Sequence, residues 1–208
     1  MGTKDKSYLK GQLLLAMPQM GDPRFHRSVI YVCSHDTKGA MGLVVNHVLP
    51  GLSFKSVLEQ FDITPDKKVS EDLAQRPVLM GGPVENVRGF LLHDKNFITS
   101  DTVHIDGTFS ISSTLVALKA VARGEGPDHM LLALGYAGWE AQQLEHEIQE
   151  NAWLTAPATE DLLFHTAPDL MWDKVMASIG INPAAHSPSV TASKTSAKLS
   201  QGTISAQP

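Results

Sequence analysis

The sequence of 208 residues has a single cysteine, Cys33. One cysteine excludes an intramolecular disulfide. Disulfides are common in secreted domains, whereas a lone thiol fits a protein that stays in a reducing compartment. We therefore expect this protein to be cytoplasmic.

Long hydrophobic runs are also missing. The longest apolar pieces are segments such as LLLAM (13–17) and MLLAL (130–134), whereas a helix needs about 20 apolar residues to span a bilayer. The first residues place lysines before a short apolar run, but Asp5 interrupts the basic part and no small-residue cleavage site follows. We expect no membrane partner, and we expect residues 1–7 to form a flexible arm.

A basic surface is missing as well. The net charge is −5, and between Gly124 and Pro183 ten acidic residues accompany one basic residue, Lys174, which gives −9 for that region. A protein that binds a nucleic-acid duplex needs a basic face to displace counterions from the phosphates. This charge distribution makes a protein or a small molecule the expected partner, rather than nucleic acid.

Large apolar residues are scarce in the segment 184–208, which is rich in Ser, Thr and Ala. Such a segment cannot bury enough surface to offset the entropy lost on ordering. We predict a disordered tail there. The remaining residues, 8–183, are enough for a single domain with one good-sized core.

Within that domain, strand-like and helix-like patterns alternate. Strands are predicted at 13–18, 28–35, 40–47 and 130–134, and on both sides of a glycine turn within 76–93. Helices are predicted at 53–61, 112–124 and 168–180, with a single turn at 161–164 and a helix that begins at about Trp139. The DTKG turn makes 28–35 and 40–47 a hairpin. These patterns predict an α+β fold, sandwich-like, with one mixed β-sheet that includes the hairpin and is flanked by helices.

Five segments resemble the YqgE/AlgH family of bacterial proteins across residues of about 8 to 183. They are GQLLLAMPQMGDPRFHRSVIYVCSH, GAMGLVVNH, GGPVENVRGFLLH, GPDHMLLALGYAGWEAQQLEHEIQENAWL and PATEDLLF, in matching order and spacing. The resemblance implies an α/β sandwich around a large mixed sheet in a bacterial cytosolic protein. The family is largely uncharacterised. It carries a label as a transcriptional regulator in alginate production, and it offers no agreed catalytic residues.

The pair Cys33 and His35 is the candidate catalytic site. Alternation along a regular strand places both side chains on one face, where an imidazole could favour the thiolate. The competing interpretation is that Cys33 is a small buried hydrophobe, since free cysteines are among the most buried residues. The valine and tyrosine that share its predicted face fit a core.

Three other motifs could carry chemistry. The GYAG and Gly81-Gly82-Pro83 segments could approach an anion closely, but neither has the lysine and Ser/Thr of a phosphate-binding loop, so we interpret both as turns. The segment EAQQLEHEIQEN contains His146, Glu147 and Glu150, but no second ligand-bearing helix matches it and no HExxH occurs. We interpret it as a solvated polar face. We expect no metal and no cofactor.

Two functional hypotheses remain open. The favoured one is a non-enzymatic regulatory or binding protein that acts through a protein or small-molecule partner, so that any effect on transcription is indirect. Its surface would combine residues at strand ends, because loops on a rigid scaffold concentrate binding groups; the candidates are Arg27, His35, Asn46, Arg88 and Trp139. The alternative is a thiol-dependent redox sensor or small hydrolase that uses Cys33 as nucleophile and His35 as base.

Overall fold

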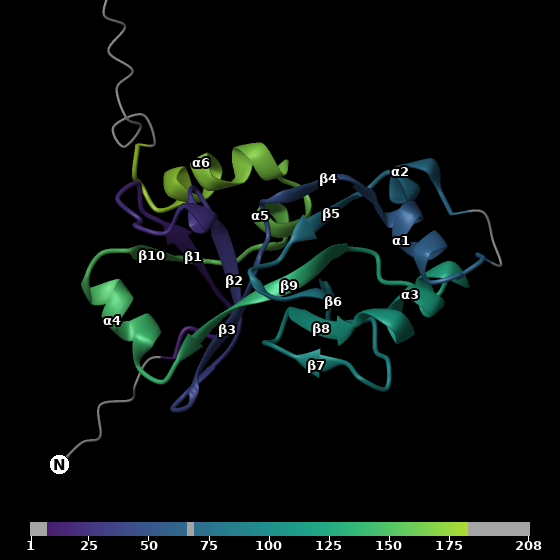
Figure 1. Ribbon diagram of the computed structural model, residues 1–208, viewed down its shortest axis with the longest axis horizontal. Coiled ribbons are helices and arrows are strands. Elements are labelled where there is room, and N and C mark those ends of the chain that lie inside the picture. The colour runs from purple at the N-terminus through teal and green to yellow at the C-terminus, as the bar shows by residue number, and fades with distance from the viewer. Residues whose placement is uncertain (1–7, 66–68, 183–208) are drawn as a thin grey trace, which may run out of the picture.

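Figure 1 shows the computed structural model of the protein, which describes residues 8–65 and 69–182. The predicted arm (1–7) and tail (184–208) lie outside these residues. The described strands are β1 (Gln12–Ala16), β2 (Val29–Asp36), β3 (Gly39–Val44), β4 (Val48–Ser53), β5 (Pro77–Met80), β6 (Val84–Asp94), β7 (Val103–His104), β8 (Phe109–Ser113), β9 (Met130–Glu140) and β10 (Trp153–Pro157). The described helices are α1 (Phe54–Gln60), α2 (Glu71–Ala74), α3 (Thr114–Ala122), α4 (Gln143–Gln149), α5 (Glu160–Phe164) and α6 (Pro168–Ser178), with a 3-10 turn η1 (Pro23–Phe25). None of these helices has the length and apolar character that a membrane span requires.

The described strands form one curled sheet in the order β10-β1-β2-β3-β9-β6-β8-β7, with β5 beside β9 and β4 beside β5. The long strand β9 runs through its middle (Figure 1). Residues 130–136 of β9 pair with β5 and β6, whereas residues 137–140 pair with β3. Every pair is antiparallel except β5 with β9. The sheet is therefore mixed, as predicted, but only one pair of its described strands is parallel.

The glycines at the centre of β9 allow this change of partner. Gly135 has a φ of +74°, and a Cβ atom there would lie 2.4 Å from the Gly82 carbonyl oxygen. A Cβ atom on Gly82 would lie 2.1 Å from the Tyr136 carbonyl carbon. The two backbones thus cross at a distance that no side chain permits. The motifs GYAG and Gly81-Gly82-Pro83 pack on each other, which explains their glycines. The predicted turn at GYAG is wrong, because these residues lie within strand β9.

Helices cover both faces of the sheet. One face packs against α5 and α6 in a cluster that includes Tyr31 and Trp172. The opposite face packs against α1 and α3, for example at Leu118, on the side of β6 and β9. On the side of β1, β2 and β3, the same face packs against α4 through Leu144, next to Trp153. The structure is α+β, as predicted, with helices on both faces of a mostly antiparallel sheet in place of a regular sandwich.

Local signals predicted several elements correctly. The hairpin is confirmed as β2 and β3. Helix α1 has the predicted N-cap, since the Ser53 side chain accepts from the Ser56 N–H in a capping box. Helix α3 is followed by Gly124 at φ +77°, and α6 begins at Pro168 and is followed by Gly180 at φ +79°.

The predicted helix from about Trp139 is wrong. Residues 135–140 continue strand β9, because residues 137–140 find pairing partners in β3. Helix α4 begins only at Gln143. The polar face predicted for this helix is also not simply solvated. The Glu147 carboxylate accepts the indole N–H groups of Trp139 and Trp153.

Candidate functional site

A cavity of about 350 Å³ lies between the parallel pair β5–β9 and the helices α5 and α6. Its apolar lining includes Val45, Phe54, Leu79, Leu131, Leu163 and Met171. Its polar lining includes Arg76, Asp72, His165 and Thr166. Pockets that bind small molecules commonly have this character, an apolar wall with a few polar groups and a volume of roughly 300–1,000 Å³.

Local hydrogen bonds fix the helical wall of the cavity. The Thr159 side chain caps α5 by accepting from the Leu162 N–H. The Thr166 hydroxyl donates to the Asp161 carbonyl oxygen at 2.9 Å, and the Lys174 ammonium of α6 donates to Thr166 at 3.3 Å. These bonds hold the turn between α5 and α6, which carries His165 and Thr166, against the sheet.

Arg76 supplies the positive charge of the cavity. Its backbone is fixed on both sides, since its carbonyl accepts from the Phe54 N–H and its own N–H donates to the Leu73 carbonyl. The half-buried guanidinium donates to the Met130 carbonyl oxygen at 3.3 Å. Among the described residues, no carboxylate lies within ion-pair distance of it. Asp72 shares the lining but is exposed. A half-buried cation beside apolar walls favours an anionic group in the cavity.

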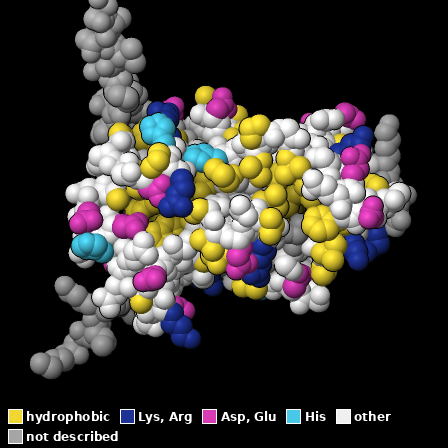
Figure 2. All heavy atoms as spheres, in the orientation of Figure 1, with side chains coloured by type: hydrophobic (Ala, Val, Ile, Leu, Met, Phe, Trp, Pro, Cys, Tyr) yellow, Lys and Arg dark blue, Asp and Glu magenta, His cyan; other side chains and the backbone are white. Residues whose placement is uncertain are grey.

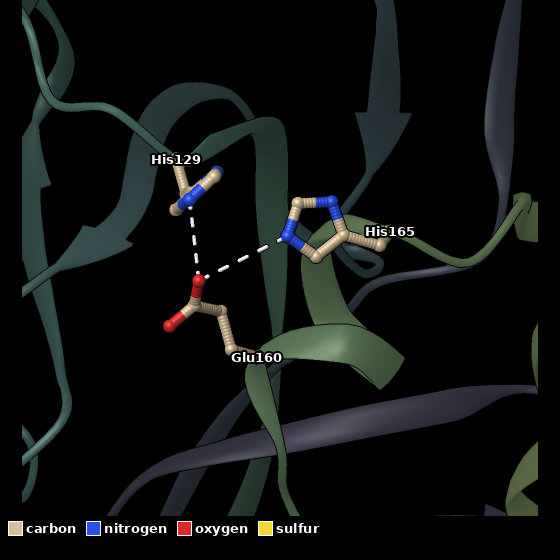
Figure 3. A group of neighbouring side chains, drawn as sticks. All are labelled: His129, Glu160 and His165. Atoms are coloured by element: carbon tan, nitrogen blue, oxygen red, sulfur yellow. Dashed lines mark ion pairs between the residues drawn. The ribbon is translucent and has the colours of Figure 1, made fainter.

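His165 also belongs to a cluster at the edge of the cavity (Figure 3). Nε2 of His129 lies 3.2 Å from Oε1 of Glu160, and Nε2 of His165 lies 3.9 Å from the same oxygen. The ring of His129 stacks on Phe164 with an interplanar angle of 19°. Glu160 and His165 come from the two ends of α5, and His129 comes from the loop before β9. These three side chains are the described group of His, Cys, Asp and Glu residues that could hold a metal ion.

The structure places Cys33 and His35 on opposite faces of the sheet. The register of β2 with β3 shifts between Val32 and Ser34, which marks a β-bulge. Cys33 packs in the core cluster on the α5–α6 side. His35 pairs with Ala40, whose side chain belongs to the cluster on the α4 side. The predicted shared face is wrong, because an extra residue in the bulge reverses the alternation.

Cys33 and His35 each make contacts that have a structural role. Burial raises the pKa of the Cys33 thiol to about 12, and its Sγ donates to the Tyr31 carbonyl oxygen at 3.6 Å. His35 Nδ1 accepts from the Leu9 N–H at 3.0 Å, and its Nε2 lies 3.3 Å from the Glu145 carboxylate. His35 thus links the hairpin to α4, and it lies on the other side of the sheet from the thiol.

Two of the candidate binding residues lie together. The Asn46 side chain accepts from the Val29 N–H at 2.8 Å and donates to the Arg27 carbonyl at 2.9 Å. The Arg27 guanidinium lies 4.3 Å from the Trp172 ring centroid and 2.7 Å from the Asp173 carboxylate. These contacts hold the loop before β2 and dock it on α6.

The remaining candidates, Arg88 and Trp139, have partners of their own. Arg88 is exposed, forms an ion pair with Glu85 at 3.1 Å and lies over the Phe90 ring. Trp139 is 7% exposed and lines a second cleft of about 460 Å³ beside α4. No hydrogen bond or ion pair between described residues joins Arg27 or Asn46 to Arg88 or Trp139.

Hydrophobic side chains also gather on the molecular surface. Figure 2 shows them over β4, β5 and α1 on the face turned to the viewer. Exposed members of or next to these elements are Val48, Met80 and Phe61, with 38–49% of each residue accessible. The cavity beside Arg76 is the better candidate site, because it combines enclosure, apolar walls and an unmatched charge.

Comparison with known proteins identifies the family. An AlgH-like family model matches residues 13–184. The chain belongs to the AlgH-like family. A UPF0301 protein of Methylobacterium nodulans is 50% identical over 182 residues, which cover 86% of this chain and 87% of the relative. A UPF0301 protein of Nitrobacter hamburgensis is 46% identical over 186 residues, 88% of this chain and 86% of the relative.

Solved structures agree with this membership. The solution structure of the AlgH protein from Pseudomonas aeruginosa matches with a TM-score of 0.72 and 40% identity, covering 89% of this chain and 96% of that one. The crystal structure of a protein from Corynebacterium diphtheriae shares the fold, with a TM-score of 0.65 and 21% identity over 82% of this chain and 86% of that one. The resemblance to the YqgE/AlgH family is confirmed. The names of these AlgH-like relatives state no ligand, so the site is argued from its own chemistry.

No motif in the sequence of this AlgH-like chain marks the groups around the cavity. Arg76 is a single arginine before the strand PVLM, and nothing in that pattern distinguishes it from a surface residue. Glu160 and His165 are five residues apart, outside the i, i+3 and i, i+4 spacings of neighbours on a helix. A histidine directly before the buried strand MLLAL was the one available signal for His129.

Proposed function

We propose that this protein is a non-enzymatic regulatory protein that binds a small amphipathic anion in the cavity between β5–β9 and α5–α6. The observation that carries the proposal is the half-buried Arg76 guanidinium, which has no carboxylate partner among the described residues and borders an apolar cavity. Its ligand would have one carboxylate or phosphate group and an apolar body of modest size.

The cavity also suggests how binding would be transmitted. Its walls come from the sheet on one side and from α5 and α6 on the other. A ligand that contacts both walls would stabilise the docked position of these helices, because a ligand favours the conformation to which it binds more tightly. A partner protein that contacts α5 or α6 would then distinguish the bound protein from the free one.

A regulatory role of this kind would operate through partners in the cytoplasm. The acidic region 124–183 includes α5 and α6 and disfavours direct contact with nucleic acid. The single cysteine is buried, which is consistent with a reducing compartment. The thiol-dependent alternative loses its predicted base, because His35 lies on the other side of the sheet from the buried Cys33 thiol.

The proposal is tested by displacement of a fluorescent apolar anion, anilinonaphthalene sulfonate, from the full-length protein. We expect decanoate to displace the dye at a concentration about tenfold lower than decanol does, because charge-assisted hydrogen bonds contribute roughly 1.5–3 kcal/mol. Arg76→Gln should remove this preference for the carboxylate, whereas Arg76→Lys should keep part of it.

Arg88→Gln is the matched control, because Arg88 is exposed and already paired with Glu85. This variant should bind decanoate as the unmodified protein does. Equal displacement by decanoate and decanol, or loss of the carboxylate preference in Arg88→Gln rather than Arg76→Gln, would overturn the proposal. Circular dichroism spectra that match the unmodified protein establish that each variant is folded.

A further inference from the structure

The cluster of His129, Glu160 and His165 brings three metal-ligating groups to one point (Figure 3). One ligand atom from each residue lies within 4.8 Å of the other two. Both imidazoles approach the same carboxylate oxygen, His129 at 3.2 Å and His165 at 3.9 Å. The cluster includes neither Cys33 nor the candidate binding residues predicted from the sequence.

We propose that His129, Glu160 and His165 bind one divalent transition-metal ion of the zinc class and leave one coordination position open. Two imidazoles and one carboxylate are a ligand set that Zn²⁺ uses at sites where the fourth ligand is water or an added group. The proposal does not depend on the ligand of the cavity, although His165 lines both.

The distances suit a small tetrahedral ion. Zinc–nitrogen and zinc–oxygen distances of about 2.0–2.2 Å place neighbouring ligand atoms roughly 3.3 Å apart in a tetrahedron. The His129–Glu160 distance of 3.2 Å already has this value, and the His165–Glu160 distance of 3.9 Å exceeds it slightly. The ligand atoms of His129 and His165 lie within 4.8 Å of each other, and rotation of these partly exposed side chains would supply the remaining adjustment.

The surrounding contacts hold the two rings in place. The His129 ring stacks on Phe164 at a centroid distance of 5.8 Å. The His165 ring meets the His129 ring edge-on at a centroid distance of 4.8 Å. The backbone of His129 is anchored to Asp94, whose Oδ2 accepts from the His129 N–H and whose N–H donates to the His129 carbonyl. His165 donates its backbone N–H to the Asp161 carbonyl. Such support lowers the entropy cost of assembling metal ligands.

An alternative is that the cluster contains only surface ion pairs. Each pair is solvent-accessible, with side-chain exposures of 34% for His129, 50% for Glu160 and 48% for His165. Exposed ion pairs contribute little to stability, which gives little reason for two histidines to share one carboxylate oxygen. Helix α4 carries a pair of this simpler kind, His146 and Glu150 at 3.4 Å, and it serves as an internal control.

The test measures metal binding to the untagged, full-length protein after treatment with a chelator. Equilibrium dialysis with Zn²⁺ should give one bound ion per chain. Addition of Co²⁺ should produce the visible absorption bands of a four- or five-coordinate ion. His129→Ala, His165→Ala and the conservative Glu160→Gln should each weaken Zn²⁺ binding by at least about tenfold, since each removes one of three ligands.

His146→Ala should leave both the affinity and the cobalt spectrum unchanged. The proposal fails if the unmodified protein binds Zn²⁺ no more tightly than Glu160→Gln, or if His146→Ala weakens binding as much as His129→Ala does. Loss of Zn²⁺ binding would leave the decanoate preference of Arg76 intact, so failure of this site and failure of the anion site give different results.

Discussion

Trp139 and Trp153 donate their indole N–H groups to the same oxygen, Oε2 of Glu147, at 2.9 and 2.7 Å. The two rings meet nearly at right angles with centroids 5.8 Å apart. Trp139 lies on β9 and Trp153 on β10, so one carboxylate on α4 joins two strands that are not neighbours in the sheet. Gln143 donates to the other oxygen of Glu147 at 2.8 Å.

Glu147→Ala is expected to destabilise the protein by about 2–4 kcal/mol, because it leaves two largely buried indole donors without their acceptor. Chemical denaturation followed by tryptophan fluorescence measures the free energy of unfolding. Glu150→Ala, on the same helix but exposed and paired only with His146, should change it by less than about 0.5 kcal/mol. Equal effects of the two substitutions would show that the shared carboxylate does not stabilise the fold.

Gly82→Ala is expected to prevent folding or to cost more than about 3 kcal/mol. A Cβ atom there would overlap the Tyr136 backbone at 2.1 Å, and the φ of +153° is unfavourable for other residues. Gly107→Ala is the control, since a Cβ atom at Gly107 meets nothing within 4 Å. Thermal unfolding compares the two variants. A midpoint for Gly82→Ala within a few degrees of that for Gly107→Ala would contradict the close crossing of β9 with the Gly81-Gly82 segment.

The sequence predicted best the features that depend on neighbouring residues. The Ser53 cap of α1, the glycine after α3 and the hairpin turn between β2 and β3 each follow from local backbone chemistry. At Trp139 the local sequence pattern predicts the wrong element. Its segment follows a glycine and precedes a polar, helix-forming run, but pairing with Ala40 on β3 keeps it in a strand. Such pairing is set by distant residues, which local patterns do not contain.

The candidate site could not be predicted from the sequence for the same reason. Its walls come from β5, β9, α5 and α6, and its cation, Arg76, stands alone in the sequence. The cluster of His129, Glu160 and His165 forms only when the loop before β9 meets both ends of α5. The interpretation of Cys33 and His35 as one site failed on a single inserted residue, because a β-bulge leaves no clear mark in an alternating strand.

Cys33 is expected to react slowly with alkylating reagents in the native protein. Burial raises the pKa of its thiol to about 12, so almost no thiolate is present at pH 7. Labelling with iodoacetamide should become fast only in denaturant. In Cys33→Ala/Ser34→Cys the thiol occupies the neighbouring exposed position, and it should be labelled at least about tenfold faster at pH 8. Rapid native labelling of Cys33 would restore the nucleophile hypothesis.

His93, on β6, belongs to a buried chain of hydrogen bonds that reaches Ser112 on β8. Its Nδ1 donates to the Asp94 carbonyl at 2.7 Å, since a carbonyl can only accept, and its Nε2 therefore accepts from the Ser112 hydroxyl at 2.9 Å. Ser112 in turn contacts the Thr102 hydroxyl at 2.8 Å. Burial lowers the pKa of His93, so the folded protein keeps this ring neutral.

The expected consequence is a loss of stability on acidification. The pKa of an unfolded histidine is about 6.5, and that of folded His93 is lower. Below about pH 6.5 the unfolded chain therefore takes up a proton that the folded protein does not, and each unit of pKa difference costs about 1.4 kcal/mol. Urea unfolding between pH 7.5 and 5 should show this decline, and His93→Gln should reduce its slope. Burial also lowers the pKa of His47, so His47→Gln should remove a separate, additive share. A slope unchanged in His93→Gln would mean that another group causes the decline.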